Sequence, residues 1–164
     1  MKFLRVDILG LIVGALLGTF VMTALMEAAQ AARLTRMSIP FLLGAMISER
    51  RVVIRVTGFT MHLMNGLIFA VAYVLLFEAL DRSDWWVGAV AGVIHGALAL
   101  SLLLPVLQDI HPRMAADDQG PDPTPMLQPP GFLGLSYGPR TPLLTLGAHA
   151  AYGAIIGLFY APFG

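Results

Sequence analysis

The 164-residue chain contains no cysteine and few charged residues. The lack of cysteine excludes disulfides, cysteine-ligated zinc, iron–sulfur clusters and thiol nucleophiles. Charged residues make up 12% of the chain, about half of the roughly 25% that is usual in soluble domains, and hydrophobic residues make up 57%. A soluble fold with so few charges could not cover its own surface, so we expect lipid to be the solvent.

Two further absences narrow the classes of function. Lysine occurs once, as Lys2, and the formal net charge is zero, so there is no basic patch of the kind that binds nucleic acid. The chain also contains no P-loop, no G-x-S-x-G elbow and no H-E-x-x-H motif. We therefore expect no nucleic-acid partner, and the sequence favours a non-enzymatic role over an enzymatic one.

Long apolar segments make up most of the sequence. Runs of about 20 apolar residues are long enough to cross the hydrocarbon core of a bilayer. The chain has four such runs, at residues 8–26, 56–77, 87–108 and 142–163. They predict an all-α integral membrane protein, a four-transmembrane-helix bundle that forms a single membrane domain over residues 1–164. The first run also has the layout of a secretory signal peptide, with small residues following it.

Two long connections separate these spans, over residues 27–55 and 109–141. In the first, Ser38 is a suitable helix N-cap and Pro40 is tolerated in a first helical turn, so we expect a short interfacial helix near residues 39–48. The second holds seven of the eleven prolines, and its polar first half through PDPTP predicts irregular structure. Its later PPGFLGLSYGPR stretch should rest on the membrane surface or fold back over the bundle. We interpret His111 as a loop residue.

Two patterns recur in the same order and predict tandem helical-hairpin repeats, over residues 8–80 and 85–163. Spans one and three carry glycines four residues apart, and spans two and four share a His-x3-Gly-x6-Tyr pattern. The glycines are Gly10, Gly14 and Gly18, then Gly88, Gly92 and Gly96. Such a glycine zipper lets membrane helices approach closely. The interpretations left open are a packing seam within one chain and a homo-oligomer interface.

Histidines within the spans are the candidate ligand-binding residues, because ionisable side chains in a membrane usually face the protein interior. The candidate set is His62, Asn65, Gly66, Tyr73, His95, His149, Tyr152, Gly153 and Tyr160. The simplest alternative needs no ligand, since a neutral histidine can hydrogen-bond a neighbouring helix.

Cofactor binding is a second alternative. His62 and His149 could ligate haem b from facing helices, with Gly66 and Gly153 leaving room for the macrocycle. Two arginines, Arg55 and Arg140, would then be available to pair with its propionates. A metal site that uses His62, His95 and His149 is chemically sensible, but no intramembrane carboxylate completes it.

Three stretches together resemble a family of small bacterial four-helix membrane proteins known only as a domain of unknown function. They are GLIVGALLGTFVMTALM near the start, FLLGAM between the first two spans and HAAYGAIIGLFY at the end. The resemblance implies a four-helix protein of the bacterial cytoplasmic (inner) membrane and supplies no activity. Arginines are more frequent in the long connections, so the positive-inside rule puts residues 27–55 and 109–141 in the cytoplasm, although Lys2 and Arg5 argue the other way.

We therefore expect a small multi-pass protein that acts as an accessory subunit or binds a hydrophobic ligand or partner. We expect it to interact with the lipid bilayer and to form a homo-oligomer or part of a larger membrane complex. The alternatives are a haem- or metal-binding redox component that uses His62 and His149, and a small transporter or channel.

Overall fold

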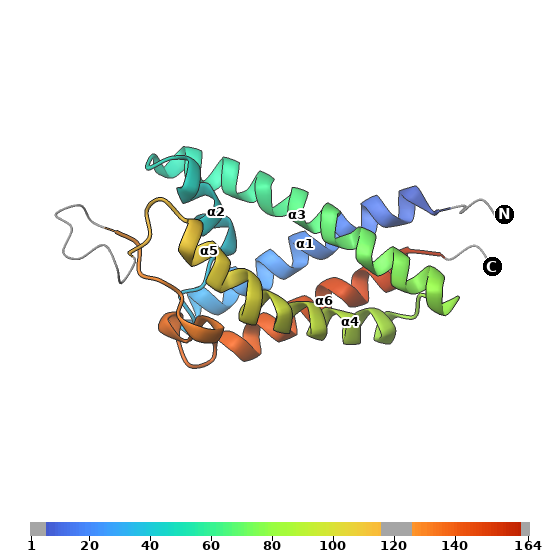
Figure 1. The fold of residues 1–164 in the computed structure, drawn as a ribbon. Coiled ribbons are helices and arrows are strands. Elements are labelled where there is room, and N and C mark those ends of the chain that lie inside the picture. Colours follow the sequence, from blue (N-terminus) through green and yellow to red (C-terminus); the bar gives the residue numbers. More distant parts are fainter. Residues whose placement is uncertain (1–5, 116–125, 162–164) are drawn as a thin grey trace.

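The computed structural model describes residues 6–115 and 126–161, and these residues fold almost entirely as helices (Figure 1). The helices are α1 (Ile8–Ala31), α2 (Ile39–Ile47), α3 (Arg51–Leu80), α4 (Trp85–Leu98), α5 (Leu104–Ile110) and α6 (Thr141–Phe159). A π-helical turn, η1 (Ala99–Leu103), joins α4 to α5, and a 3₁₀ turn, η2 (Phe132–Tyr137), precedes α6. Four helices are long and apolar enough to cross a membrane: α1, α3, the continuous α4–η1–α5 unit and α6. The expected all-helical, four-helix architecture is confirmed.

Three of the four long helices extend beyond the predicted spans. The second span, predicted over residues 56–77, is a 30-residue helix from Arg51 to Leu80, and the first continues beyond residue 26 to Ala31. Hydropathy locates the apolar part of a helix, whereas backbone hydrogen bonds continue through flanking polar residues. The fourth span is shorter than predicted, because α6 ends at Phe159. Residues 162 and 163 of that prediction lie outside the described part.

The short helix α2 forms where its N-terminal residues predicted it. The Ser38 hydroxyl accepts a hydrogen bond from the Phe41 N–H at 3.3 Å, and Pro40 occupies the first turn. Leu42 and Leu43 are buried. A Cβ at Gly44 would overlap the backbone of α3, so α2 is tucked against the bundle.

Helix α6 lies between α1 and α4, and glycines permit both contacts. Gly14 of α1 faces the Ile156 backbone, so that a Cβ placed there would come within 3.2 Å of it. On α4, a Cβ at Gly88 would overlap the carbonyl oxygen of Gly153, and one at Gly92 would overlap that of His149. The glycine rows are therefore packing seams within the chain, and both meet the same helix.

Helix α3 packs on α1 and α2, and Gly66 faces the Thr19 side chain of α1. The short turn after α3 leads into α4, but these two helices separate toward the end of the bundle that holds α2 and η2 (Figure 1). The α3 and α4 backbones approach each other closely at only a few positions among the described residues.

A proline explains the π turn in the third long helix. Pro105 has no N–H, and its ring would crowd the carbonyl of Ser101 one turn earlier. The helix widens there, and the Leu104 N–H bonds the carbonyl of Ala99, five residues back. Such π turns are rare and occur frequently at functional sites.

Candidate functional site

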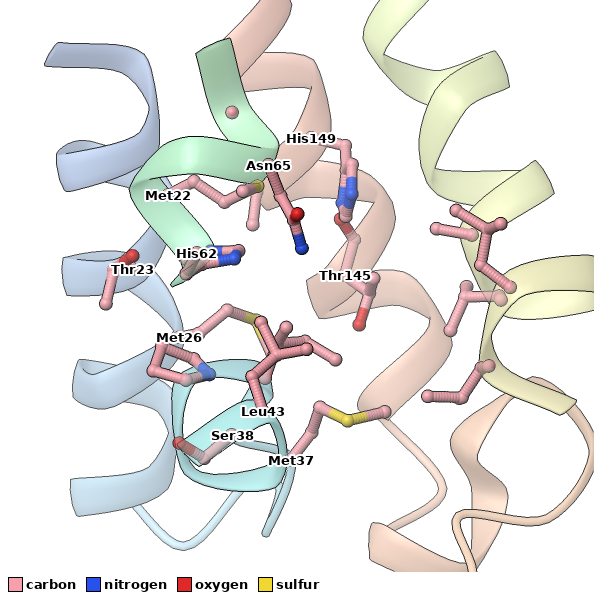
Figure 2. Close-up of a pocket in the computed structure, with 18 of the residues that line it drawn as sticks. Met22, Thr23, Met26, Met37, Ser38, Leu43, His62, Asn65, Thr145 and His149 are labelled. Carbon is pink, nitrogen blue, oxygen red and sulfur yellow. The ribbon is translucent and has the colours of Figure 1, made fainter. Parts of the chain in front are cut away.

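A cavity of about 370 Å³ lies inside the bundle and draws its walls from most of the helices (Figure 2). Its volume is within the range of roughly 300–1,000 Å³ that is typical of small-molecule sites. Apolar residues supply most of the wall, among them three methionines. The apolar lining residues include Met22, Met26, Met37, Leu43, Ala99 and Leu103.

Six of the nine candidate residues line this cavity, although they come from three different helices. They are His62, Asn65, Gly66, His95, His149 and Tyr152. Tyr73, Gly153 and Tyr160 do not line it. Gly153 instead packs against Gly88.

His95 and His149 are in contact at one end of the cavity. Their rings meet edge to face, with centroids 4.9 Å apart and planes at 84°. His149 Nδ1 lies 2.8 Å from the Thr145 carbonyl oxygen, which assigns the proton to Nδ1 because a carbonyl can only accept. His95 Nδ1 lies 3.1 Å from the Tyr73 hydroxyl. Both rings are thus fixed by neighbouring helices or by the preceding turn.

Two tyrosines pack behind the histidines. The Tyr152 hydroxyl donates a 2.5 Å hydrogen bond to the Gly66 carbonyl, which links α6 to α3. The Tyr73 and Tyr152 rings are perpendicular, with centroids 5.4 Å apart. Each of these four side chains thus makes a hydrogen bond within the bundle, and together they form a packing cluster.

His62 and Thr145 behave differently. In the described part of the chain, only the Nδ1 of His62 and the Oγ1 of Thr145 are buried side-chain polar atoms without a hydrogen-bond partner. The two residues expose 9% and 7% of their surface, and both line the cavity. Figure 2 shows them around the same space, together with the Asn65 amide. Leaving a buried polar group unpaired costs about 1–3 kcal/mol, so this wall of the cavity is ready to receive a polar group.

The charge around the cavity is low. Among the described residues, the lining contains no arginine, lysine or aspartate, and its one carboxylate, Glu27, is exposed. The candidate propionate partners Arg55 and Arg140 are exposed and do not line it. The described cavity wall offers hydrogen bonds but no arginine or lysine to balance a negative charge.

The proposed room for a haem next to Gly66 and Gly153 is filled. A Cβ at Gly66 would overlap the Thr19 hydroxyl, and one at Gly153 would overlap the Gly88 carbonyl. These glycines admit neighbouring helices, not a macrocycle. Within residues 6–115 and 126–161, no three histidine, aspartate or glutamate side chains form a group able to hold a metal ion. The packing at these glycines leaves no slot for the haem, and the described donor set does not provide the three-ligand metal site.

Tyr160 lies at the opposite end of the bundle, beside the turn that joins α3 to α4. The His-x3-Gly-x6-Tyr pattern and the predicted span place Tyr160 on the same helix as His149 and Gly153, but it follows the last residue of α6 and has extended backbone angles. Its hydroxyl donates to Glu78 at 2.5 Å, and its carbonyl accepts from the Ser83 hydroxyl. Burial, together with the hydrogen bond to Glu78 and the charge of its carboxylate, raises the pKa of the Tyr160 phenol.

Sequence reasoning missed two buried residues. Thr145 lies four residues before His149, so helical spacing could have placed it on the same face. His111 follows α5 in a loop, as interpreted, but it is buried. Its Nε2 donates to the Leu42 carbonyl at 3.0 Å and its Nδ1 accepts from the Arg113 N–H at 3.1 Å, which anchors the second connection to α2. No local pattern indicates that contact.

Comparison with protein-family models, with curated proteins and with solved structures finds no match to this chain.

Proposed function

We propose that this protein is a multi-pass membrane protein that binds a hydrophobic ligand in the cavity between α3, α6 and η1. The observation that carries the proposal is the mostly apolar cavity of about 370 Å³, whose wall holds two unpartnered polar atoms. Ligand sites are usually largely apolar, with a few polar groups that fix orientation. The role is binding, not catalysis.

Membrane insertion is part of the proposal and is supported by the outer surface. The four long helices present many large apolar side chains outward, including Leu9 at 73%, Ile68 at 62% and Leu143 at 74% exposure. Water would be a poor solvent for such a surface, whereas lipid tails suit it. Trp85 and Trp86 are exposed at the start of α4, where an interfacial aromatic belt is expected.

The distribution of arginines supports the proposed orientation, and the family resemblance supports the proposed type of membrane. We propose the bacterial inner membrane, with α2 and η2 on the cytoplasmic side. The connections over residues 27–55 and 109–141, on the cytoplasmic side, carry seven arginines, whereas the basic residues assigned to the opposite side are Lys2, Arg5 and Arg82. The internal duplication stays a prediction. The α1 glycines pack on α6, so a symmetric pair of hairpins would pack the α4 glycines on α3. In the structure, both glycine rows instead pack on α6.

Filling the cavity tests the proposed function. Ala99→Phe and Leu43→Trp place larger side chains in its wall from different elements. Ala97→Phe is the matched control, because Ala97 is exposed, lies two residues away and does not line the cavity. Native mass spectrometry of the detergent-purified protein with decylbenzene should detect a bound adduct for the wild type and for Ala97→Phe.

Both filling variants should lose the adduct while keeping their helical circular dichroism. Retention of the adduct in both would contradict ligand binding in this cavity. The absence of an adduct in the folded wild-type protein would overturn the proposed function altogether.

A further inference from the structure

We infer, on the basis of the proposed function, that the ligand is an uncharged amphiphile whose head group carries a hydrogen-bond-accepting oxygen, such as a quinone. The head group lies between His62 of α3 and Thr145 of α6, and the apolar part lies along the methionine-lined wall. The unpartnered atoms, the charge of the lining and its apolar surface each support this assignment.

Thr145 requires an acceptor. Hydroxyl groups within helices commonly donate to the carbonyl four residues earlier. Among residues 6–115 and 126–161, five hydroxyl groups do so, at Thr19, Thr23, Thr57, Thr60 and Ser101. Thr145 has no such bond, although the residue is buried and exposes only 7% of its surface. Its O–H is therefore free to donate to a ligand oxygen.

His62 supplies the second contact. Its Nδ1 is buried without a partner, and the ring points into the same space as Thr145 (Figure 2). An imidazole nitrogen donates or accepts according to its tautomer. A carbonyl oxygen matches the donor tautomer of His62, and a hydroxyl group matches either. One oxygen-bearing head group can thus form hydrogen bonds with both the His62 and the Thr145 side chain.

The head group should carry no charge. A carboxylate or phosphate buried here would meet neither arginine nor lysine in the described lining, so its charge could be balanced only by protonating a lining histidine. A buried ammonium group would lack a carboxylate, since Glu27 is exposed. An unpaired buried charge is far more costly than an unpaired neutral group. Fatty acids, phosphate-bearing head groups and amines are therefore disfavoured.

The remaining wall suits an apolar ring or chain. Met22, Met26 and Met37 supply flexible thioethers that adapt to irregular shapes. On the η1–α5 side, lining residues Leu103 and Val106 are also 45% and 54% exposed. The cavity thus meets the outer apolar surface at the π turn, which offers an apolar ligand a lateral route from lipid.

Paired probes and paired threonine variants test the inference. The probes are decyl-1,4-benzoquinone, decylbenzene, decanoate and decylamine, with binding to the full chain in detergent measured by native mass spectrometry. Thr145→Val removes the unpartnered hydroxyl with little change of shape. Thr23→Val is its matched control, because Thr23 also lines the cavity but its hydroxyl already bonds the Thr19 carbonyl.

The quinone should bind more tightly than decylbenzene, and the two charged probes should bind more weakly than either. Thr145→Val should weaken quinone binding by roughly three- to tenfold, the effect of one hydrogen bond, whereas Thr23→Val should not change it. Decylbenzene binding should be unaffected by Thr145→Val. His62→Phe should likewise reduce the preference for the quinone.

Equal binding of the quinone and decylbenzene, unaffected by Thr145→Val, would overturn this inference and leave the proposed function intact. Preferential binding of decanoate or decylamine would also overturn it. So would an experimental structure in which an ordered water bridges His62 Nδ1 and Thr145 Oγ1 and persists at saturating quinone. Failure of all probes to bind the folded protein would overturn both proposals.

Discussion

The His95 ring meets the His149 ring edge to face across α4 and α6, with centroids 4.9 Å apart. Each ring is also held by a second contact, His95 by the Tyr73 hydroxyl and His149 by the Thr145 carbonyl. These contacts fix the two rings, whereas His62 Nδ1 and Thr145 Oγ1 are, among the described residues, the fully buried side-chain polar atoms without a partner. The distinction separates residues that hold the bundle together from residues available to a ligand.

The hydrogen bond between Tyr73 and His95 should stabilise the bundle slightly. Tyr73→Phe removes a hydroxyl 3.1 Å from His95 Nδ1, and hydrogen bonds between membrane helices contribute about 0.6 kcal/mol on average. A double-mutant cycle with His95→Phe, followed by unfolding in detergent, should give a coupling free energy of about that size. Additive effects of the two substitutions would show that the two side chains do not stabilise each other.

Close packing of α4 on α6 should make Gly153 intolerant of substitution. A Cβ there would overlap the Gly88 carbonyl, so Gly153→Ala should lower the free energy of unfolding by about 1–3 kcal/mol. Gly147→Ala is the matched control on the same helix, because nothing lies within 4 Å of its added Cβ. The control should be neutral or stabilising by up to about 1 kcal/mol, from helix propensity. Equal thermal stability of the two variants would contradict this packing.

The buried His111 should anchor the second connection. His111→Phe removes the contacts to the Leu42 carbonyl and the Arg113 N–H, and it should destabilise the fold by about 1–3 kcal/mol. Faster hydrogen exchange at the Arg113 amide would locate the effect. Pro112→Ala, at an exposed neighbouring position, should leave both stability and exchange unchanged. Unchanged exchange in His111→Phe would argue against the anchor.

Tyr160 should make the fold sensitive to alkaline pH. Burial and the contact with Glu78 raise the pKa of its phenol above the ordinary value of about 10. The neutral phenol is therefore favoured in the folded state, so this contribution to stability is complete below about pH 10 and is lost as the pH rises through the folded-state pKa. Tyr160→Phe should be less stable than the wild type at pH 7 and should lose less stability between pH 9 and pH 11.

Chemical unfolding at the two pH values measures this difference. Glu78→Gln keeps an acceptor for the Tyr160 hydroxyl but removes the charge, so its alkaline loss should lie between those of the wild type and Tyr160→Phe. Identical pH profiles for the wild type and Tyr160→Phe would exclude a role for this phenol.

Local signals in the sequence determined much of the architecture. The number of apolar runs and their lengths predicted the four long helices, because crossing a bilayer requires about 20 apolar residues. Ser38 and Pro40 predicted the start of α2, because capping and proline geometry act within one turn. Glycines spaced by four predicted close helix contacts. The histidines indicated which parts of the spans face the interior.

The tertiary structure alone decided which surfaces meet. Gly66 receives the Thr19 side chain of α1 and Gly153 receives the Gly88 backbone of α4, so both glycines admit neighbouring helices, although the sequence equally allowed a slot for a ligand. The contact of His95 with His149 and the pairing of His111 with α2 depend on the order of helices in space. Helical periodicity specifies which residues share a face but not which helix covers that face. For this reason the unpaired Thr145 hydroxyl, and the cavity that it shares with His62, emerged only when the helices were packed.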